Sequence, residues 1–201
     1  MKVKEAKQIT GSLTRTSKMP GLSYSLPAWE CKTGSKLRKV KGSVCSACYA
    51  LKGNYTRYKA IKIAQYRRLA AIKLEGWTRA MAAQIIRQKY FRWHDAGDIQ
   101  DAVHLQKIFR VCELTPETSH WMPTREAQFL KDIDPETVPK NGIIRMSSHM
   151  VDQAPVTFWP WTSTVTSGQD STCPAPTQEG QCKDCRACWD RSTPNVCYGK
   201  H

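Results

Sequence analysis

Apolar positions between residues 55 and 89 recur with the spacing of a helix. From Tyr55 the pattern predicts a basic helix with Tyr58, Ile61, Gln65, Leu69 and Ile72 on one stripe. A shorter helix is predicted over residues 77–89. The polar and basic residues 2–25, which contain several glycine and proline breakers, predict extended or irregular structure.

Short apolar runs then alternate with helical spacing. Strands are predicted over residues 90–93, 120–122, 143–147 and 162–166, and helices over residues 99–113 and 125–132. This alternation favours parallel βαβ units, but there are too few for a closed eight-stranded barrel. We therefore expect an α/β fold, a small partial barrel or open parallel sheet with flanking helices, closed by loop-rich cysteine segments at both ends.

The length of 201 residues indicates a single domain. Within it we expect a cysteine loop over 26–52, an α/β core over 55–166 and a cysteine module over 167–201. No stretch is apolar enough to span a bilayer and the first residues lack an apolar signal region, so a cytoplasmic protein is expected. In that reducing compartment the nine cysteines favour metal binding over disulfides.

Cysteine spacing is the strongest chemical signal. Three thiols separated by two residues each suit an iron–sulfur cluster, expected to be [4Fe–4S], better than other common uses. Zinc is the alternative metal, because paired cysteines at large separation also fit tetrahedral zinc. A fourth ligand could come from Cys173 or Cys197, and the N-terminal cysteines could complete the same site or build a second. The candidate ligands are Cys31, Cys45, Cys48, Cys173, Cys182, Cys185, Cys188 and Cys197. Cys112 lies in an apolar helical stripe, which predicts a buried thiol.

Polar residues follow three of the predicted strands. The carboxyl ends of parallel strands share one edge, where acid–base chemistry or anion binding is usual. Each residue also has a structural interpretation, as a helix cap at Asp98, a surface pair of Arg125 with Glu126, or buried histidines. The candidates are His94, Asp95, Asp98, Arg125, Glu126 and His149.

At these residues the sequence resembles a bacteriophage family known as gene product eighty-eight. The resemblance rests on Cys45-Ser-Ala-Cys48-Tyr49-Ala50, residues 91–98 with His104-Leu105, residues 121–126, and residues 182–189. It implies a phage origin, hence the host cytoplasm, and an iron–sulfur centre. The segment Cys45–Tyr49 is more weakly similar to the cluster loop of radical S-adenosylmethionine enzymes. In those enzymes a cysteine-bound [4Fe–4S] cluster sits at the mouth of a partial barrel; here Cys31 lies far from Cys45, and no glycine-rich cofactor motif follows.

Several functions remain open at this point. An iron–sulfur-dependent hydrolase of ester or thioester substrates would use an open iron with the acid–base residues, and Arg125 would hold an anionic substrate. The alternatives are radical chemistry on S-adenosylmethionine, electron transfer, and nucleic-acid binding by a protein whose fold a bound metal stabilises. The formal net charge of +14 favours anionic small molecules or nucleic acid as partners and does not choose between them.

Overall fold

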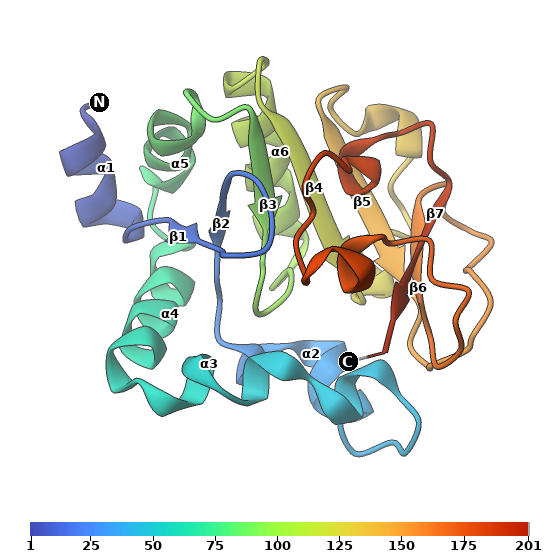
Figure 1. Cartoon of the computed structure of the whole chain (residues 1–201). Helices are drawn as coiled ribbons and strands as arrows, with labels where there is room; N and C mark the ends of the chain where they lie inside the picture. Colours follow the sequence, from blue (N-terminus) through green and yellow to red (C-terminus); the bar gives the residue numbers. More distant parts are fainter. Residues whose placement is uncertain (201) are drawn as a thin grey trace.

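Seven strands form one sheet whose spatial order follows the chain (Figure 1). The computed structural model describes residues 1–200. β1 (Thr14–Arg15) pairs antiparallel with β2 (Leu22–Tyr24), and every later pairing is parallel. The remaining strands are β3 (Tyr90–Trp93), β4 (Ser119–Thr124), β5 (Gly142–Ser147), β6 (Thr162–Thr166) and β7 (Asn195–Gly199). The expected α/β class is confirmed, as an open and mostly parallel sheet.

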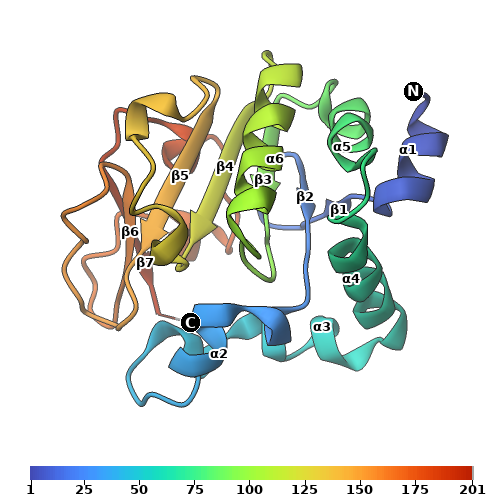
Figure 2. The ribbon, with the colours of Figure 1, turned by 180° about the vertical axis from the view of Figure 1, so that it is seen from behind.

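Helices cover one face of this sheet and the C-terminal segment covers the other. Figure 2 shows α6 (Ala102–Leu114) in front of the strands and α5 (Trp77–Ile85) beside it, in contact with α6 and with α1 (Val3–Thr10) packed on α5. On the opposite face lie the 3-10 turns η6 (Ala175–Gln178) and η7 (Ala187–Trp189) (Figure 1). No helix among residues 1–200 has the length and apolarity needed to cross a bilayer.

The part of the long connection from β2 to β3 that precedes α5 consists of several mostly short elements along one side of the molecule. They are η1 (Ala28–Glu30), α2 (Lys32–Leu37), η2 (Val44–Ala47), η3 (Tyr49–Leu51), α3 (Asn54–Arg57) and α4 (Lys59–Ala71). Two further turns, η4 (Ala127–Phe129) and η5 (Pro135–Thr137), join β4 to β5.

The predicted strands lie where the apolar runs placed them, but several other elements differ. Residues 2–25, predicted irregular, contain α1, β1 and β2. The helix expected from Tyr55 is divided at Tyr58, whose backbone is extended. The helix expected over 125–132 is wrong: only the short turn η4 forms there, because Glu126 leaves the helical region to direct its side chain elsewhere. β7 was not predicted.

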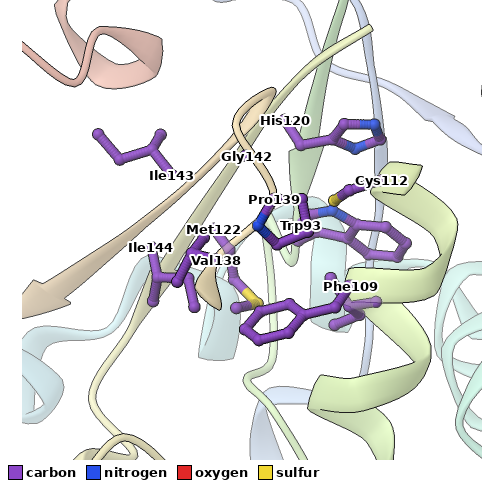
Figure 3. A pocket seen from close by; sticks show the side chains of 11 residues that line it. Trp93, Phe109, Cys112, His120, Met122, Val138, Pro139, Gly142, Ile143 and Ile144 are labelled. Carbon is purple, nitrogen blue, oxygen red and sulfur yellow. The ribbon is translucent and has the colours of Figure 1, made fainter. Parts of the chain in front are cut away.

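Aromatic rings fill the core between the sheet and its helices. The ring of Trp93 lies 4.9 Å from Phe91 and 6.0 Å from Trp77, and is stacked at 6.1 Å on His120. Behind these rings is a cavity of about 10 Å³, beside Cys112 and His120 (Figure 3). That volume is at the lower limit for a single water molecule, so this layer contributes packing rather than a binding site.

Arg145 of β5 joins the C-terminal segment to the sheet. Its side chain is fully buried, and its three nitrogens donate to five backbone carbonyls at 2.6–3.3 Å. The acceptors belong to Thr162, Ala187, Cys188, Asp190 and Thr193. A buried cation with this many acceptors fixes η7 against the sheet face.

Replacing Arg145 by Met should leave these carbonyls without donors and destabilise the fold by on the order of 4 kcal/mol. Urea unfolding measures the loss, and limited proteolysis should cut preferentially within residues 167–194. Arg110→Met, at an exposed pair with Glu113, is the matched control and should change stability by less than about 0.5 kcal/mol. A change of less than about 1 kcal/mol in Arg145→Met would contradict this role.

Buried histidines make the fold sensitive to acid. Burial lowers the pKa of His120 to about 3 and that of His94 to about 4, both from an ordinary value of 6.5. The unfolded chain therefore binds protons that the folded chain excludes, and stability is lost as pH falls below 6.5.

A His120→Gln variant should remove one part of this acid sensitivity. Relative to the variant, the parent protein should lose about 1 kcal/mol of unfolding free energy per pH unit between pH 6 and pH 4. Urea titrations of both proteins at pH 4 to 8 provide the measurement. The stability difference should stay constant above pH 7; a difference that is constant down to pH 4 would mean His120 is protonated in the folded chain.

Candidate functional site

The cysteines separate into two groups in space. The first, here called the N-terminal thiol group, comprises Cys31, Cys45 and Cys48 in the connection that follows β2. Burial, together with the nearby Asp98 and the other two thiols, raises the pKa of Cys31. The Sγ atoms of Cys31 and Cys45 lie 3.8 and 3.6 Å from the position that a Cβ atom on Gly34 would occupy. α2 and the turn after it therefore bring together two cysteines that are distant in sequence.

The second set, the C-terminal thiol group, comprises Cys173, Cys182, Cys185 and Cys188. Burial raises the pKa of Cys182, and its neighbours Cys173 and Cys185 raise it further. The amide of Cys185 donates to the carbonyl of Cys182 at 2.9 Å, and the amide of Cys182 to Lys18 O at 2.8 Å. These bonds form the turn and attach it to the β1–β2 loop.

Cys188 is the most enclosed member of the C-terminal thiol group. Its Sγ lies 3.1 Å from the hydroxyl of Tyr198, and burial raises the pKa of the thiol to about 11. Neighbouring residues of a strand point to opposite faces, so Cys197 in β7 points away from the face on which Tyr198 meets Cys188. The backbone carbonyl of Cys197 accepts from the amide of Cys173 at 3.0 Å, and the role of its thiol as a ligand stays a prediction. Cys112 is buried in α6, as its helical pattern predicted.

Arg92 lies between the two thiol groups. Its Nη2 donates to the hydroxyl of Tyr49, the residue after Cys48, at 3.3 Å. Its positive charge lowers the pKa values of Cys182 and Cys188 against the effect of burial. The guanidinium lies 4.6 Å from the ring centroid of Trp121, and its buried Nε has no hydrogen-bond acceptor within residues 1–200. One side chain thus contacts the loop of the first group and acts electrostatically on the second.

Asp98 joins the carboxyl ends of β3 and β4. Its carboxylate accepts from Thr124 Oγ1 at 2.6 Å, from the Arg125 amide at 2.9 Å and from the Ile99 amide at 2.8 Å. Burial raises its pKa to about 6 despite these three donors. The capping alternative is wrong for Asp98, since Asp101 caps α6 by accepting from the His104 amide at 2.7 Å.

Glu126 positions the start of α2. It is fully buried, and its carboxylate accepts from the Thr33 amide at 2.9 Å and from the Thr33 hydroxyl at 2.7 Å. The alternative of a surface pair with Arg125 is therefore wrong. Because Thr33 comes two residues after Cys31, this contact fixes the N-terminal thiol group. Thr33 carries no motif that sequence reasoning could have detected.

Asp95 ties the same connection to β2. Its carboxylate accepts from Ser23 Oγ at 2.5 Å, from Ser25 Oγ at 2.7 Å and from the Tyr55 hydroxyl at 2.8 Å. The Tyr49 hydroxyl also donates to the backbone carbonyl of Asp95. The residue was predicted as catalytic, and its contacts are those of an anchor for the loop.

His94 is directed into the aromatic core. It adopts a φ of 58°, its Nδ1 lies 3.1 Å from the carbonyl of Tyr24, and its ring centroid is 5.3 Å from that of His104. With its pKa lowered, the imidazole is neutral. These contacts place the His94 ring in the core, where its buried Nε2 has no hydrogen-bond partner within residues 1–200. Its role in the site stays a prediction.

Arg125 and His149 lie beside Cys45. Arg125 lowers the pKa of Cys45 against the effect of burial, and its Nε donates to Ser148 O at 3.2 Å. His149 Nε2 is 3.3 Å from the carbonyl of Arg125, and its own carbonyl accepts from the Val44 amide at 2.9 Å. The residues that follow the strands were expected to lie close together at one edge of the sheet. This is observed for Asp98, Arg125, Glu126 and His149.

The thiols of each group are neighbours without being gathered at one point. Within residues 1–200, no three His, Cys, Asp or Glu side chains adopt an arrangement that could hold a metal ion. Metal binding at either group would therefore require the thiols to turn inward. Their chemistry, soft sulfur donors in sets of three and four, is that of iron–sulfur and zinc ligands.

Removing the Glu126 carboxylate should loosen α2 and expose the N-terminal thiol group. In Glu126→Ala we expect Cys31 and Cys45 to be alkylated at least severalfold faster, as followed by mass spectrometry of the metal-free, reduced protein. Cys185, in the other group, serves as the internal control and should react at the parent rate, as should all thiols of Glu113→Ala. Equal acceleration at all cysteines would indicate general unfolding and contradict a local role.

Comparison with known proteins yields one match. A family model described as Gene product 88 covers residues 1–191, a range that contains both thiol groups and ends before Cys197. No curated protein and no solved structure matches the chain.

Proposed function

Because the chain belongs to the phage gene product 88 family, and the matched residues include both thiol groups, we propose that it is an iron–sulfur enzyme. In this proposal Cys31, Cys45 and Cys48 hold a [4Fe–4S] cluster. The observation that carries it is the position of these thiols: they follow the first parallel strand of the sheet and lie beside Asp98 and Glu126 at its carboxyl edge. This is the edge at which parallel α/β folds usually place their chemistry.

The residues around the N-terminal thiol group fit such a cluster. Gly34 has no side chain, and a Cβ atom there would lie 3.0 Å from Cys31 Cβ, so the glycine keeps space beside two thiols. The loop is fixed at two places, through Thr33 to Glu126 and through Tyr55 to Asp95. A cluster held by three cysteines supplies an iron with an open position and, when reduced, one electron.

The reaction best supported is one-electron reductive cleavage of S-adenosylmethionine. Two observations favour it over the other chemistries: six parallel strands in sequential order, as in a partial barrel, and a cysteine site in the first connection of that sheet. In the radical S-adenosylmethionine enzymes the cluster cysteines lie in one compact loop. In this chain Cys31 and Cys45 are farther apart, and α2 lies between them. Arg125, beside Cys45, uses Nε for Ser148, which leaves its terminal nitrogens to hold a carboxylate.

Hydrolysis of an ester or thioester is the second candidate. Asp98, whose pKa is raised to about 6, is suited to accept a proton near neutral pH. The other expected acid–base groups favour this chemistry less, since Asp95 and Glu126 are occupied as anchors and His94 lies in the core.

We further propose that the C-terminal thiol group binds a metal of its own. Four thiols can complete the shell of a zinc ion or of a second iron–sulfur cluster, leaving no open position. Such a site would stabilise the segment over the sheet or pass electrons, and Arg92 with Tyr49 connects it to the first group.

Anaerobically purified protein should be brown and contain iron and sulfide. Under strong reductant with S-adenosylmethionine it should release 5′-deoxyadenosine and methionine, measured by chromatography and mass spectrometry. Cys45→Ser should abolish this release, because the open-iron cluster is lost. Cys112→Ser, which removes a buried thiol outside both groups, is the matched control and should retain it.

The iron content separates the remaining possibilities. Loss of part of the iron in Cys45→Ser and of another part in Cys185→Ser supports two sites. Zinc alone in anaerobically purified protein overturns the iron–sulfur proposal. Iron-loaded protein that hydrolyses esters or thioesters, but releases no 5′-deoxyadenosine, replaces the first reaction by the second.

A further inference from the structure

Nearly all of the net positive charge lies in one segment of the chain. Residues 31–74 contain twelve lysines and arginines and no aspartate or glutamate. The rest of the chain holds the other 19 basic residues against all 17 acidic ones, so it is close to neutral. The +14 charge is therefore a property of α2, α3, α4 and the turns between them, here called the basic segment.

Most cations of the basic segment face solvent; Arg68 is buried and donates to the carbonyls of Ser12 and Ser25. Lys36, Lys39, Lys52 and Lys59 are exposed. Among residues 1–200 the only ion pair is Arg110 with Glu113, which lies outside this segment. A solvated helix face usually mixes both signs of charge. Here one acid, Glu30, accepts from the Tyr66 hydroxyl of α4 at 2.9 Å, and the large excess of cations carries a repulsion that an anionic partner would relieve.

The basic segment also presents aromatic side chains among its cations. Tyr58, at the break between α3 and α4, is 51% exposed, and Tyr49 is 50% exposed. Figure 1 shows α2 and α3 along one side of the molecule, with α4 rising from their end. Lys32 directly follows Cys31, so the strip of charge begins at the N-terminal thiol group.

We propose that the basic segment binds single-stranded nucleic acid. Spaced lysines and arginines track a phosphate backbone, and exposed tyrosines between them offer faces for unpaired bases. An anionic membrane or an acidic protein would satisfy the charges but has no bases to stack on Tyr58. The inference rests on charge and exposure, and it stands or falls independently of the metal proposed above.

The test is fluorescence anisotropy with labelled fifteen-nucleotide single strands, one DNA and one RNA of the same sequence. Binding should weaken steeply with salt between 50 and 200 mM. The double variant Lys36→Glu with Lys59→Glu should bind on the order of tenfold more weakly at 0.1 M salt, with a log–log salt slope shallower by about 1.4. Tyr58→Ala should lose about fivefold or more, whereas Tyr58→Phe should bind as the parent does.

A matched control reverses two exposed charges elsewhere. Lys131→Glu with Lys140→Glu, in the connection from β4 to β5, makes the same change in net charge and should bind within about twofold of the parent. Equal losses in both double variants, or an affinity that ignores salt, would overturn the assignment of the surface. So would binding to phosphatidylserine vesicles without binding to either strand. A preference between DNA and RNA identifies which nucleic acid the surface favours.

Discussion

The structure depends on three carboxylates buried at one edge of the sheet. The cysteine-bearing part of the connection from β2 to β3 contains little apolar material, and its own core is a small cluster around Ala28, Ala50 and Ala96. Three carboxylates hold this part of the connection against the sheet edge, and each accepts at least three hydrogen bonds. They belong to Asp95, Asp98 and Glu126. A buried carboxylate without such donors would cost several kcal/mol, so loop and sheet edge stabilise each other.

This arrangement explains why residues expected to do chemistry are found as supports. Asp95 and Glu126 lie where acid–base residues would, yet their donors come from the cysteine connection. The carboxylates therefore orient the thiols, and the open part of the edge is left to Arg125, His149 and the N-terminal thiol group. In the proposed function, these supports would serve chemistry at a bound cofactor rather than direct proton transfer by side chains.

The sequence predicted what depends on local pattern and missed what depends on distant partners. β3 and β5 were visible because large apolar residues lie on both sides of a single arginine, and β6 because it is rich in β-branched threonine and valine. In contrast, β2 is short and β7 lies in a polar, cysteine-rich tail. The strand-end residues were found because parallel strands end at one edge. Their roles were not, because Thr33, Ser23 and Tyr55 carry no signal until the fold brings them together. The burial of His94 was not predicted as the main interpretation, because its positive φ, which no sequence pattern shows, accompanies a ring placed in the core.

The anchors of the N-terminal thiol group also set the order in which the chain can acquire its structure. The three cysteines of this group are synthesised early. The carboxylates that fix them come later: Asp95 follows Cys48 by 47 residues, and Glu126 follows Cys31 by 95 residues. During translation these thiols therefore emerge unshielded, and they gain their final surroundings only once β4 has joined the sheet. Insertion of the proposed cofactor would then follow completion of the sheet rather than the appearance of the cysteines themselves.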